Sequence, residues 1–353
     1  MSLLKNSTIV VAGVVVSNLL GYAFHFIVGR WLGPEEYGEF GALMALFLMV
    51  ALPSWALSWA VTKFTSRLYA ENKLGDIAVL RKKMQNDVLI FSAAVLLIII
   101  LCSPWIAAFL KIPSALPVII VGSTLVFALL LPVNRGILQG MKKFRILSVN
   151  TIIEAGARLV LLTLFLFIGK GVIGAILAYG LAYFVAFLAV FPNIKETKTG
   201  KVSTEVSSIK PVYTFILKVL MANLLIQSII NVPALVIKHL YTDEFTGYWT
   251  AALNIARLSL FVTAAISMVM FPEIAGEQEH QNKKKIFNRA ALLVLFTSLG
   301  AAIVFFAIPG LLLRTLYGPS FEGAVPVLEW MGFGMIFIGL LQLRVDYYLA
   351  ELK

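Results

Sequence analysis

The chain has 353 residues, of which 60% are hydrophobic and only 13% are charged, with a mean hydropathy of +0.92. Soluble domains are about 45–50% apolar and about 25% charged, so the composition argues against a soluble globular enzyme of any class. The net charge of +11 would suit a nucleic-acid partner, but it equally suits the positive-inside bias of membrane proteins.

Apolar runs of membrane-spanning length follow one another along the whole chain. A bilayer core of about 30 Å requires about 20 apolar residues per helix. Continuous runs such as VLIFSAAVLLIIIL favour helices over the alternating pattern of a β-barrel. The first run is expected to remain as a helix, since no clear cleavage site follows it. Ten spanning helices are predicted, at about 8–30, 38–62, 87–110, 115–140, 148–168, 171–193, 213–238, 246–272, 288–313 and 324–350.

The basic residues alternate between the two sides of these predicted helices. The first segment and every second loop together hold 18 Lys and Arg residues, whereas the alternate connections hold 5. This asymmetry predicts a multi-pass protein of the cell (cytoplasmic or inner) membrane, with its N-terminus in the cytoplasm. The dispersal of the basic residues over five loops, with no aromatic stacking platform, excludes a nucleic-acid partner.

A polar stretch after the sixth predicted helix, KETKTGKVSTEVSSIK, is typical of a linker between two halves. An Asn-Leu-Leu at 18–20 recurs at 223–225, each before the second helix of its half, which indicates a weak internal repeat. Six helices precede the linker and four follow it, so the second lobe is expected to be incomplete or truncated. The predicted division is an amino-terminal six-helix lobe at 1–194, a basic cytoplasmic linker at 195–212 and a carboxyl-terminal lobe at 213–353.

Polar side chains line single faces of three predicted helices. Amide and ionisable groups at bilayer depth usually face a bundle interior or a wet cavity. The alternatives are hydrogen bonds between helices, at about 0.6 kcal/mol each, and for His25 ordinary packing. The stripes are Asn18 with His25 on the first helix, Asn223 with Gln227 and Asn231 on the seventh, and Asn254 with Arg257 on the eighth.

Charged residues within the predicted helices admit two interpretations each. Arg257 lies near mid-helix with no carboxylate within four residues on its own helix, which favours a substrate or cavity role. Glu154 and Arg158 have the spacing of an intrahelical ion pair, and they either neutralise each other or form a gating or coupling pair. Arg30 and Arg135 lie near helix ends, where they either snorkel to the interface or line a cavity.

Catalytic, metal and cofactor sites are not expected. The single cysteine and three scattered histidines cannot form a disulfide framework or a zinc cluster. The sequence lacks a phosphate-binding Gly-rich loop with a following Lys-Ser/Thr, and it lacks a Ser-His-Asp or paired-carboxylate arrangement on one surface.

Four segments together resemble the oligosaccharide-lipid and polysaccharide flippases of the multidrug/oligosaccharidyl-lipid/polysaccharide exporter superfamily. They are GRWLGPEEYGEFGAL at 29–43, NRGILQGMKKF at 134–144, GYWTAALNIARL at 247–258 and LYGPSFEGAVPVL at 316–328. The resemblance covers essentially the whole chain. Family members commonly have twelve or fourteen helices, so the ten predicted here depart from that pattern.

The resemblance implies an all-α transporter with two six-helix lobes around a central cavity. Such a protein would move a polyprenyl-diphosphate-linked oligosaccharide to the outer leaflet by alternating access, alongside a polysaccharide polymerase and chain-length machinery. Relatives bind the anionic head group with cationic cavity residues, a role that fits Arg257 best, then Arg30 and Arg135. Asn231 and Asn254 suit sugar hydroxyls.

Three other function classes remain open from the sequence. An ion-coupled multidrug antiporter of the same superfamily would need buried carboxylates, which are scarce here. A membrane-embedded glycosyltransferase or polymerase would need larger polar loops with catalytic groups. A scaffold of a biosynthetic complex would tolerate single substitutions in the cavity.

Overall fold

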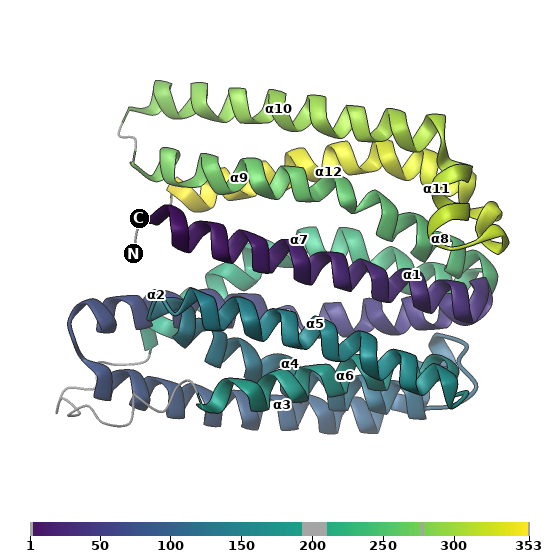
Figure 1. Ribbon diagram of the computed structural model, residues 1–353, viewed down its shortest axis with the longest axis horizontal. Helices are drawn as coiled ribbons and strands as arrows, with labels where there is room; N and C mark the ends of the chain where they lie inside the picture. Colours follow the sequence, from purple (N-terminus) through teal and green to yellow (C-terminus); the bar gives the residue numbers. More distant parts are fainter. Residues whose placement is uncertain (1–2, 193–209, 277–278, 352–353) are drawn as a thin grey trace. The chain divides into compact units, whose positions relative to one another are not determined.

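A computed structural model describes residues 3–192, 210–276 and 279–351, and their regular structure is helical (Figure 1). The elements are α1 (Leu3–Val50), α2 (Pro53–Ala70), α3 (Leu74–Phe109), α4 (Leu116–Gly140), α5 (Phe144–Phe167), α6 (Gly171–Val190), α7 (Lys210–Leu240), α8 (Asp243–Ala256), α9 (Leu258–Gly276), α10 (His280–Ala307), α11 (Pro309–Leu316), the 3-10 helix η2 (Pro319–Ala324) and α12 (Val325–Glu351).

Nine helical segments of the described chain are long and apolar enough to cross a membrane. The first, Gly13–Ala70, contains the first two predicted helices, and the other eight correspond one to one with the rest. Within α1 the two helices meet at Gly33, whose φ of 74° and ψ of 177° are not helical. A positive φ is readily adopted by glycine, and Pro34 follows it. The protein is therefore an all-α, multi-pass membrane protein.

Several helices extend beyond the apolar runs that predicted them. The predicted basic loop at 63–86 is mostly helical, because α2 continues to Ala70 and α3 already begins at Leu74. Hydropathy detects only the part of a helix that suits hydrocarbon, so polar turns at its ends escape the prediction. The predicted helix at 246–272 is divided into α8 and α9, with Arg257 at the junction rather than in mid-helix.

The chain forms two compact units. The first comprises Met1–Trp31 and Ala42–His239, and the second comprises Leu32–Gly41 and Leu240–Lys353. Most of the predicted linker at 195–212 lies outside the described residues, so the lobe boundaries proposed from the sequence stay a prediction. Helix α7, which follows that linker, belongs almost entirely to the first unit.

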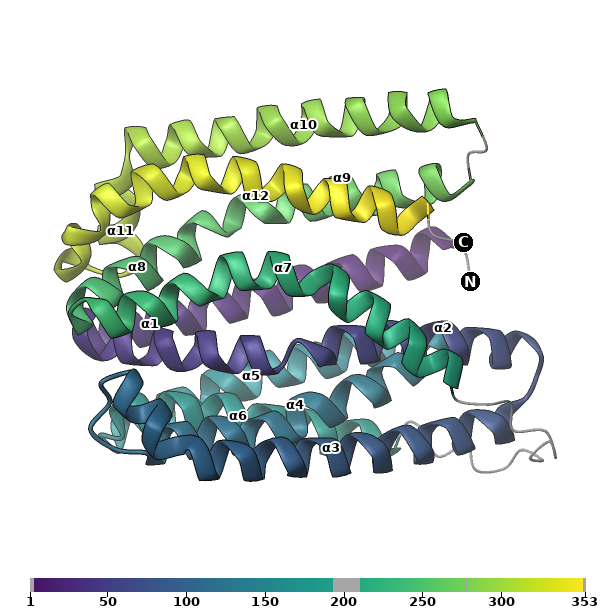
Figure 2. The ribbon, with the colours of Figure 1, turned by 180° about the vertical axis from the view of Figure 1, so that it is seen from behind.

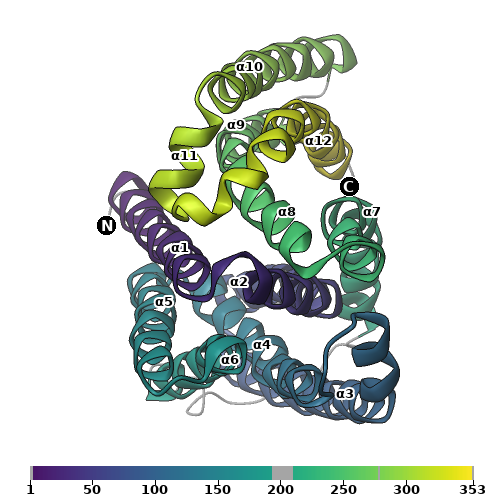
Figure 3. The same ribbon diagram turned by 90° about the vertical axis from the view of Figure 1, so that its right-hand side faces the viewer.

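Helix α4 is the centre of the first unit, with α2, α3 and α6 against it (Figure 3). Most of its residues are buried, as expected for a helix that is apolar on nearly all sides. Its glycines allow close helix contact, since a Cβ on Gly136 would lie 2.8 Å from Val61 Cβ and one on Gly140 would lie 2.5 Å from Thr65 Cβ. This central position places Arg135, near the end of α4, among its neighbours.

Helix α7 is attached to α3 near both of its ends (Figure 2). Near its start, the Tyr213 hydroxyl donates to Asp87. Near its end, the His239 ring stacks on Phe109 with centroids 4.3 Å apart, and its Nδ1 lies 2.8 Å from the Phe109 carbonyl oxygen. The polar stripe predicted on this helix therefore belongs to the first unit.

The second unit packs α9, α10 and α12 around an apolar core that includes Met270, Val294 and Leu343. Residues 32–41 pack against α8 in the same unit. A Cβ on Gly38 would overlap the Asp243 carbonyl oxygen, so this close contact requires glycine. Tyr37 is fully buried here, and its hydroxyl has a partner, since it lies 3.1 Å from the hydroxyl of Tyr317.

Candidate functional site

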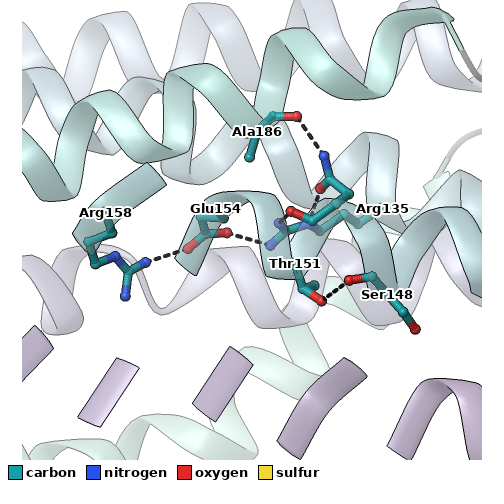
Figure 4. A network of polar contacts seen from close by, with 7 residues as sticks. Arg135, Ser148, Thr151, Glu154, Arg158 and Ala186 are labelled. Atoms are coloured by element: carbon teal, nitrogen blue, oxygen red, sulfur yellow. Dashed lines mark hydrogen bonds and ion pairs between the residues drawn. The ribbon is translucent and has the colours of Figure 1, made fainter. Parts of the chain in front are cut away.

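A buried ionic network lies on α4 and α5 in the first unit (Figure 4). Arg135 Nη1 of α4 is 2.8 Å from Glu154 Oε2 of α5. Arg158, one turn further along α5, pairs with the other carboxylate oxygen, Oε1. One carboxylate thus accepts from two guanidinium groups.

Asn150 extends the network on the same face of α5, since it precedes Glu154 by one helical turn. Its Oδ1 accepts from Arg135 Nε at 2.8 Å, its carbonyl oxygen accepts from Arg135 Nη2 at 3.3 Å, and its Nδ2 donates to the Ala186 carbonyl of α6 at 2.8 Å. All three Arg135 nitrogens therefore have partners, which fixes this guanidinium in place. One interpretation from the sequence was that Arg135 extends to the membrane interface. In the structure its guanidinium group instead contacts Glu154 and Asn150.

Arg158 has a different environment, formed by aromatic rings. Its guanidinium carbon lies 3.8 Å from the centroid of the Tyr179 ring, and the rings of Tyr183 and Phe24 lie within 6 Å. Stacking on an aromatic face stabilises a guanidinium and leaves its edge available for donation. The buried Arg158 Nε has no hydrogen-bond partner among the described residues, so this arginine retains a donor.

The network carries a net charge of +1 inside the protein, from two arginines and one glutamate. Glu154 and Arg158 are only 8% and 9% exposed, and the Arg135 side chain is 18% exposed. Buried charges are costly unless they are paired, so an excess positive charge with a spare donor favours an anionic ligand. This is the strongest candidate site among the described residues.

The other residues singled out in the first unit lie on α1 and α7. Asn18 and His25 on α1 are half-buried, with the His25 ring edge-on to Phe24, and Arg30 is exposed. The amides on α7 bond within their own helix: Asn223 Nδ2 donates to the Val219 carbonyl, and Asn231 Nδ2 donates to the Gln227 carbonyl and side chain. Their proposed contact with substrate stays a prediction.

Asn254 and Arg257 belong to the second unit. Asn254 is buried, and its Nδ2 donates to the Tyr37 hydroxyl at 2.9 Å. Arg257 is half-buried, and its backbone N–H bonds to the Leu253 carbonyl at the end of α8.

The sequence reasoning singled out three members of the network and missed the residues that hold them. Asn150, Tyr179 and Tyr183 were not predicted as site residues. The four-residue spacing of Asn150, Glu154 and Arg158 was visible in the sequence and could have added the asparagine. The tyrosines on α6 carry no such local signal, because their role depends on how α6 packs against α5.

Solved structures of other membrane proteins share this fold. The inward-facing form of a multidrug resistance MATE transporter of the MOP superfamily matches 95% of this chain and 83% of its own, with a TM-score of 0.73 and 15% identity. The lipid II flippase MurJ, in an inward closed conformation, matches 97% of this chain and 75% of its own, with a TM-score of 0.72 and 16% identity. The chain therefore has the fold of these two proteins, as the sequence predicted.

The amino-acid sequence assigns the chain to a family within the group of proteins that share this fold. Residues 3–278 match the family described as polysaccharide biosynthesis protein, and the chain belongs to that family. An uncharacterized membrane protein of Methanocaldococcus jannaschii is 30% identical over 212 residues, which are 57% of this chain and 47% of that protein. The chain therefore spans about half of this relative.

Proposed function

We propose that the protein flips a polyprenyl-diphosphate-linked oligosaccharide from the cytoplasmic to the outer leaflet of the cell membrane by alternating access, for cell-surface polysaccharide biosynthesis. The observation that carries this proposal is the buried network of Arg135, Glu154 and Arg158, with its excess positive charge and spare Arg158 donor. Membership of the polysaccharide biosynthesis family supports it, and so does the shared fold with a protein named as a lipid II flippase.

The head group of such a lipid needs a polar path, since its charges and hydroxyls would lose their water in hydrocarbon. Arginine can replace that water, because its planar fork donates two parallel hydrogen bonds to phosphate oxygens. The polyprenyl tail is itself apolar and can stay in lipid while the head group crosses.

The contacts suggest separate roles for the two arginines. Arg158 binds phosphate oxygens through its unpaired Nε, with its stacking on Tyr179 holding the guanidinium plane. Arg135 is held by Asn150 and Glu154, so it positions the carboxylate and adds positive charge. Glu154 is the counter-ion that both arginines share until an anion enters, and this exchange is the gating role proposed for the Glu154–Arg158 pair.

The remaining polar residues supply sugar contacts in this proposal. Asn223, Gln227, Asn231 and Asn254 offer amides to sugar hydroxyls, with Asn18 and His25 as further polar contacts, while Arg257 and Arg30 remain proposed cations for the anionic head group. Polysaccharide polymerase and chain-length machinery are the proposed partners, because they would take up the flipped lipid at the outer leaflet.

The test measures the leaflet distribution of lipid-linked oligosaccharide in cells that depend on this gene. Arg158→Gln removes the charge and the fork, and we expect the lipid to accumulate on the cytoplasmic leaflet. Arg158→Lys keeps the charge but loses the fork, so partial transport is expected. Arg67→Gln is the matched control, since the Arg67 side chain is 78% exposed, and it should transport normally.

The same experiment contains the outcomes that contradict the proposal. Normal transport by Arg158→Gln at unchanged membrane abundance would remove this residue from the mechanism. No accumulation in cells lacking the gene would instead favour an ion-coupled multidrug antiporter, which dye-efflux measurements would detect. Sugar transfer by the purified protein from a lipid-linked donor would favour a glycosyltransferase.

A further inference from the structure

A second group of polar side chains lies in the first unit, where α3 packs on α4. Arg81 Nε of α3 donates to Asn134 Oδ1 of α4 at 3.1 Å. Gln85 Nε2, one helical turn after Arg81, donates to the same oxygen at 2.9 Å. Asn134 is fully buried, whereas Arg81 and Gln85 are half-buried. One amide oxygen therefore holds two side chains of α3 against α4, and we name these three residues the Arg81 site.

The Arg81 site has more hydrogen-bond donors than acceptors. The buried Nδ2 of Asn134 has no acceptor among the described residues. Arg81 uses its Nε for the contact with Asn134, so the two terminal nitrogens of its planar fork remain without a partner in the described part of the chain. Buried polar groups without a partner are rare in native proteins and require an explanation, such as a missing ligand or water. The site therefore lacks an acceptor.

The neighbouring carboxylates of α3 do not supply that acceptor. Asp87, further along the helix, pairs with Lys83 at 3.0 Å. Asp76, five residues before Arg81, projects from a different side of α3, because a helix has 3.6 residues per turn. Arg81 thus carries a half-buried positive charge that has no counter-ion within the described chain. A cation removed from water is costly unless it is paired, so this position favours an anion.

The exposed surface beside Arg81 is apolar. The Arg81 guanidinium carbon lies 5.3 Å from the centroid of the Phe191 ring, which follows α6. Phe191 and Leu188, near that end of α6, are both exposed, and so are Leu89 and Ile90, about two turns beyond Arg81 on α3. Both helices pack on α4 (Figure 3). Arg81 therefore lies where the apolar surface of a membrane span meets the more polar end of its helix.

We propose that Arg81 binds the phosphate group of an anionic membrane phospholipid, with Asn134 and Gln85 as positioning residues. The phosphate oxygens accept from the terminal nitrogens of Arg81, while the acyl chains lie along the exposed apolar residues of α3 and α6. Asn134 Oδ1 fixes the direction of the guanidinium fork. This inference does not depend on the proposed function, because the site is separate from the Arg135–Glu154–Arg158 network and requires no oligosaccharide.

The chemistry of the site matches a lipid head group. A guanidinium fork donates two parallel hydrogen bonds to a phosphate, which a point charge cannot do. Basic pockets between spanning helices on the cytoplasmic side bind anionic head groups, and the sequence predicts that the basic segment at 63–86 faces the cytoplasm. Free phosphate offers the same oxygens, but the exposed apolar side chains beside Arg81 favour a molecule that also carries acyl chains.

Lipid binding can be measured on the purified protein in a neutral detergent, without any transport substrate. Phosphatidylglycerol is the anionic probe and phosphatidylcholine the zwitterionic one, and native mass spectrometry counts the lipids bound to the intact protein. We expect the wild type to prefer phosphatidylglycerol by at least about tenfold. Arg81→Gln should lose this preference, since a hydrogen bond to a charged group accounts for about tenfold in affinity or more. Arg81→Lys keeps the charge without the fork and should be intermediate.

Two further variants separate the site from general charge and from damage to the fold. Arg67→Gln changes the net charge equally at a 78% exposed arginine and should bind like the wild type. Asn134→Asp keeps an acceptor for Arg81 and Gln85 but gives Arg81 a counter-ion, so it should lose the preference for phosphatidylglycerol while still melting cooperatively without lipid. This variant decides the test if Arg81→Gln fails to fold.

Three results would overturn the inference. Wild-type selectivity in both Arg81→Gln and Asn134→Asp would place the lipid elsewhere. Equal binding of phosphatidylcholine and phosphatidylglycerol by the wild type would show that no anionic head group is recognised. Displacement of phosphatidylglycerol by millimolar inorganic phosphate would show that the site takes a soluble anion and not a lipid.

Discussion

Replacing Glu154 by glutamine tests whether the buried network is held together by its single carboxylate. The substitution keeps the shape of the side chain but leaves Arg135 and Arg158 without their shared counter-ion. At about 4 Å between charge centres and an effective dielectric constant of about 20, each pair is worth about 4 kcal/mol before desolvation. Because breaking a buried pair strands a charge, we expect Glu154→Gln to lower the free energy of unfolding by about 3–5 kcal/mol.

A double-mutant cycle separates the interaction energy of the Glu154–Arg158 pair from other destabilising effects of the two substitutions. Arg158→Gln alone should cost less, because Glu154 keeps its contact with Arg135. The double variant should be more stable than the sum of the single losses predicts, with a coupling energy of about 1–3 kcal/mol. The assay is reversible unfolding in mixed micelles as the denaturing detergent increases. A loss below about 0.5 kcal/mol for Glu154→Gln, or a coupling energy near zero, would refute the electrostatic reasoning.

Three further predictions concern other parts of the structure, and each is checked by the same unfolding assay. Gly38→Ala should cost about 3 kcal/mol because its methyl group overlaps a backbone carbonyl, whereas Gly21→Ala, with open space around it, should be neutral or stabilise by up to about 1 kcal/mol. Asn134→Ala should cost about 1–3 kcal/mol, since Asn134 Oδ1 accepts from Arg81 and Gln85, while Asn134→Asp, which keeps the acceptor, should cost less. Glu71 lies between spans, and hydrogen bonds from Lys73 and then Arg67 hold the pKa of its exposed carboxyl below the usual 4.5. Its contribution is therefore present above pH 4.5 and lost as the pH falls through the native pKa, so the small stability difference between wild type and Glu71→Gln should vanish in acid.

The spanning helices could be predicted from the sequence because a segment that crosses the bilayer must be apolar over the thickness of the hydrocarbon core. A spanning segment must bond its backbone internally, so a long apolar run has few alternatives to a helix. The ends of the helices could not be predicted in this way. Helix α3 begins at Leu74, earlier than predicted, and one predicted helix is divided at Arg257. Ends and junctions depend on water, head groups and neighbouring helices, which an apolar run does not encode.

The candidate site could be predicted only where it follows one helix. Glu154 and Arg158 are four residues apart, so their pairing is a local property of α5. Arg135 comes from α4, and Tyr179 from α6, and their approach depends on packing between helices.

The position of residues 32–41 in the second unit has a consequence for how the chain is made. These residues pack against α8, so they are synthesised about 200 residues before their partners, a delay of about 10–40 s at 5–20 residues per second. During that interval Tyr37, which is fully buried in the finished protein, has no Tyr317 or Asn254 to contact. A membrane chaperone that shields short apolar hairpins would act at this stage, and ribosome stalling before residue 243 should prolong crosslinking of such a factor to position 37.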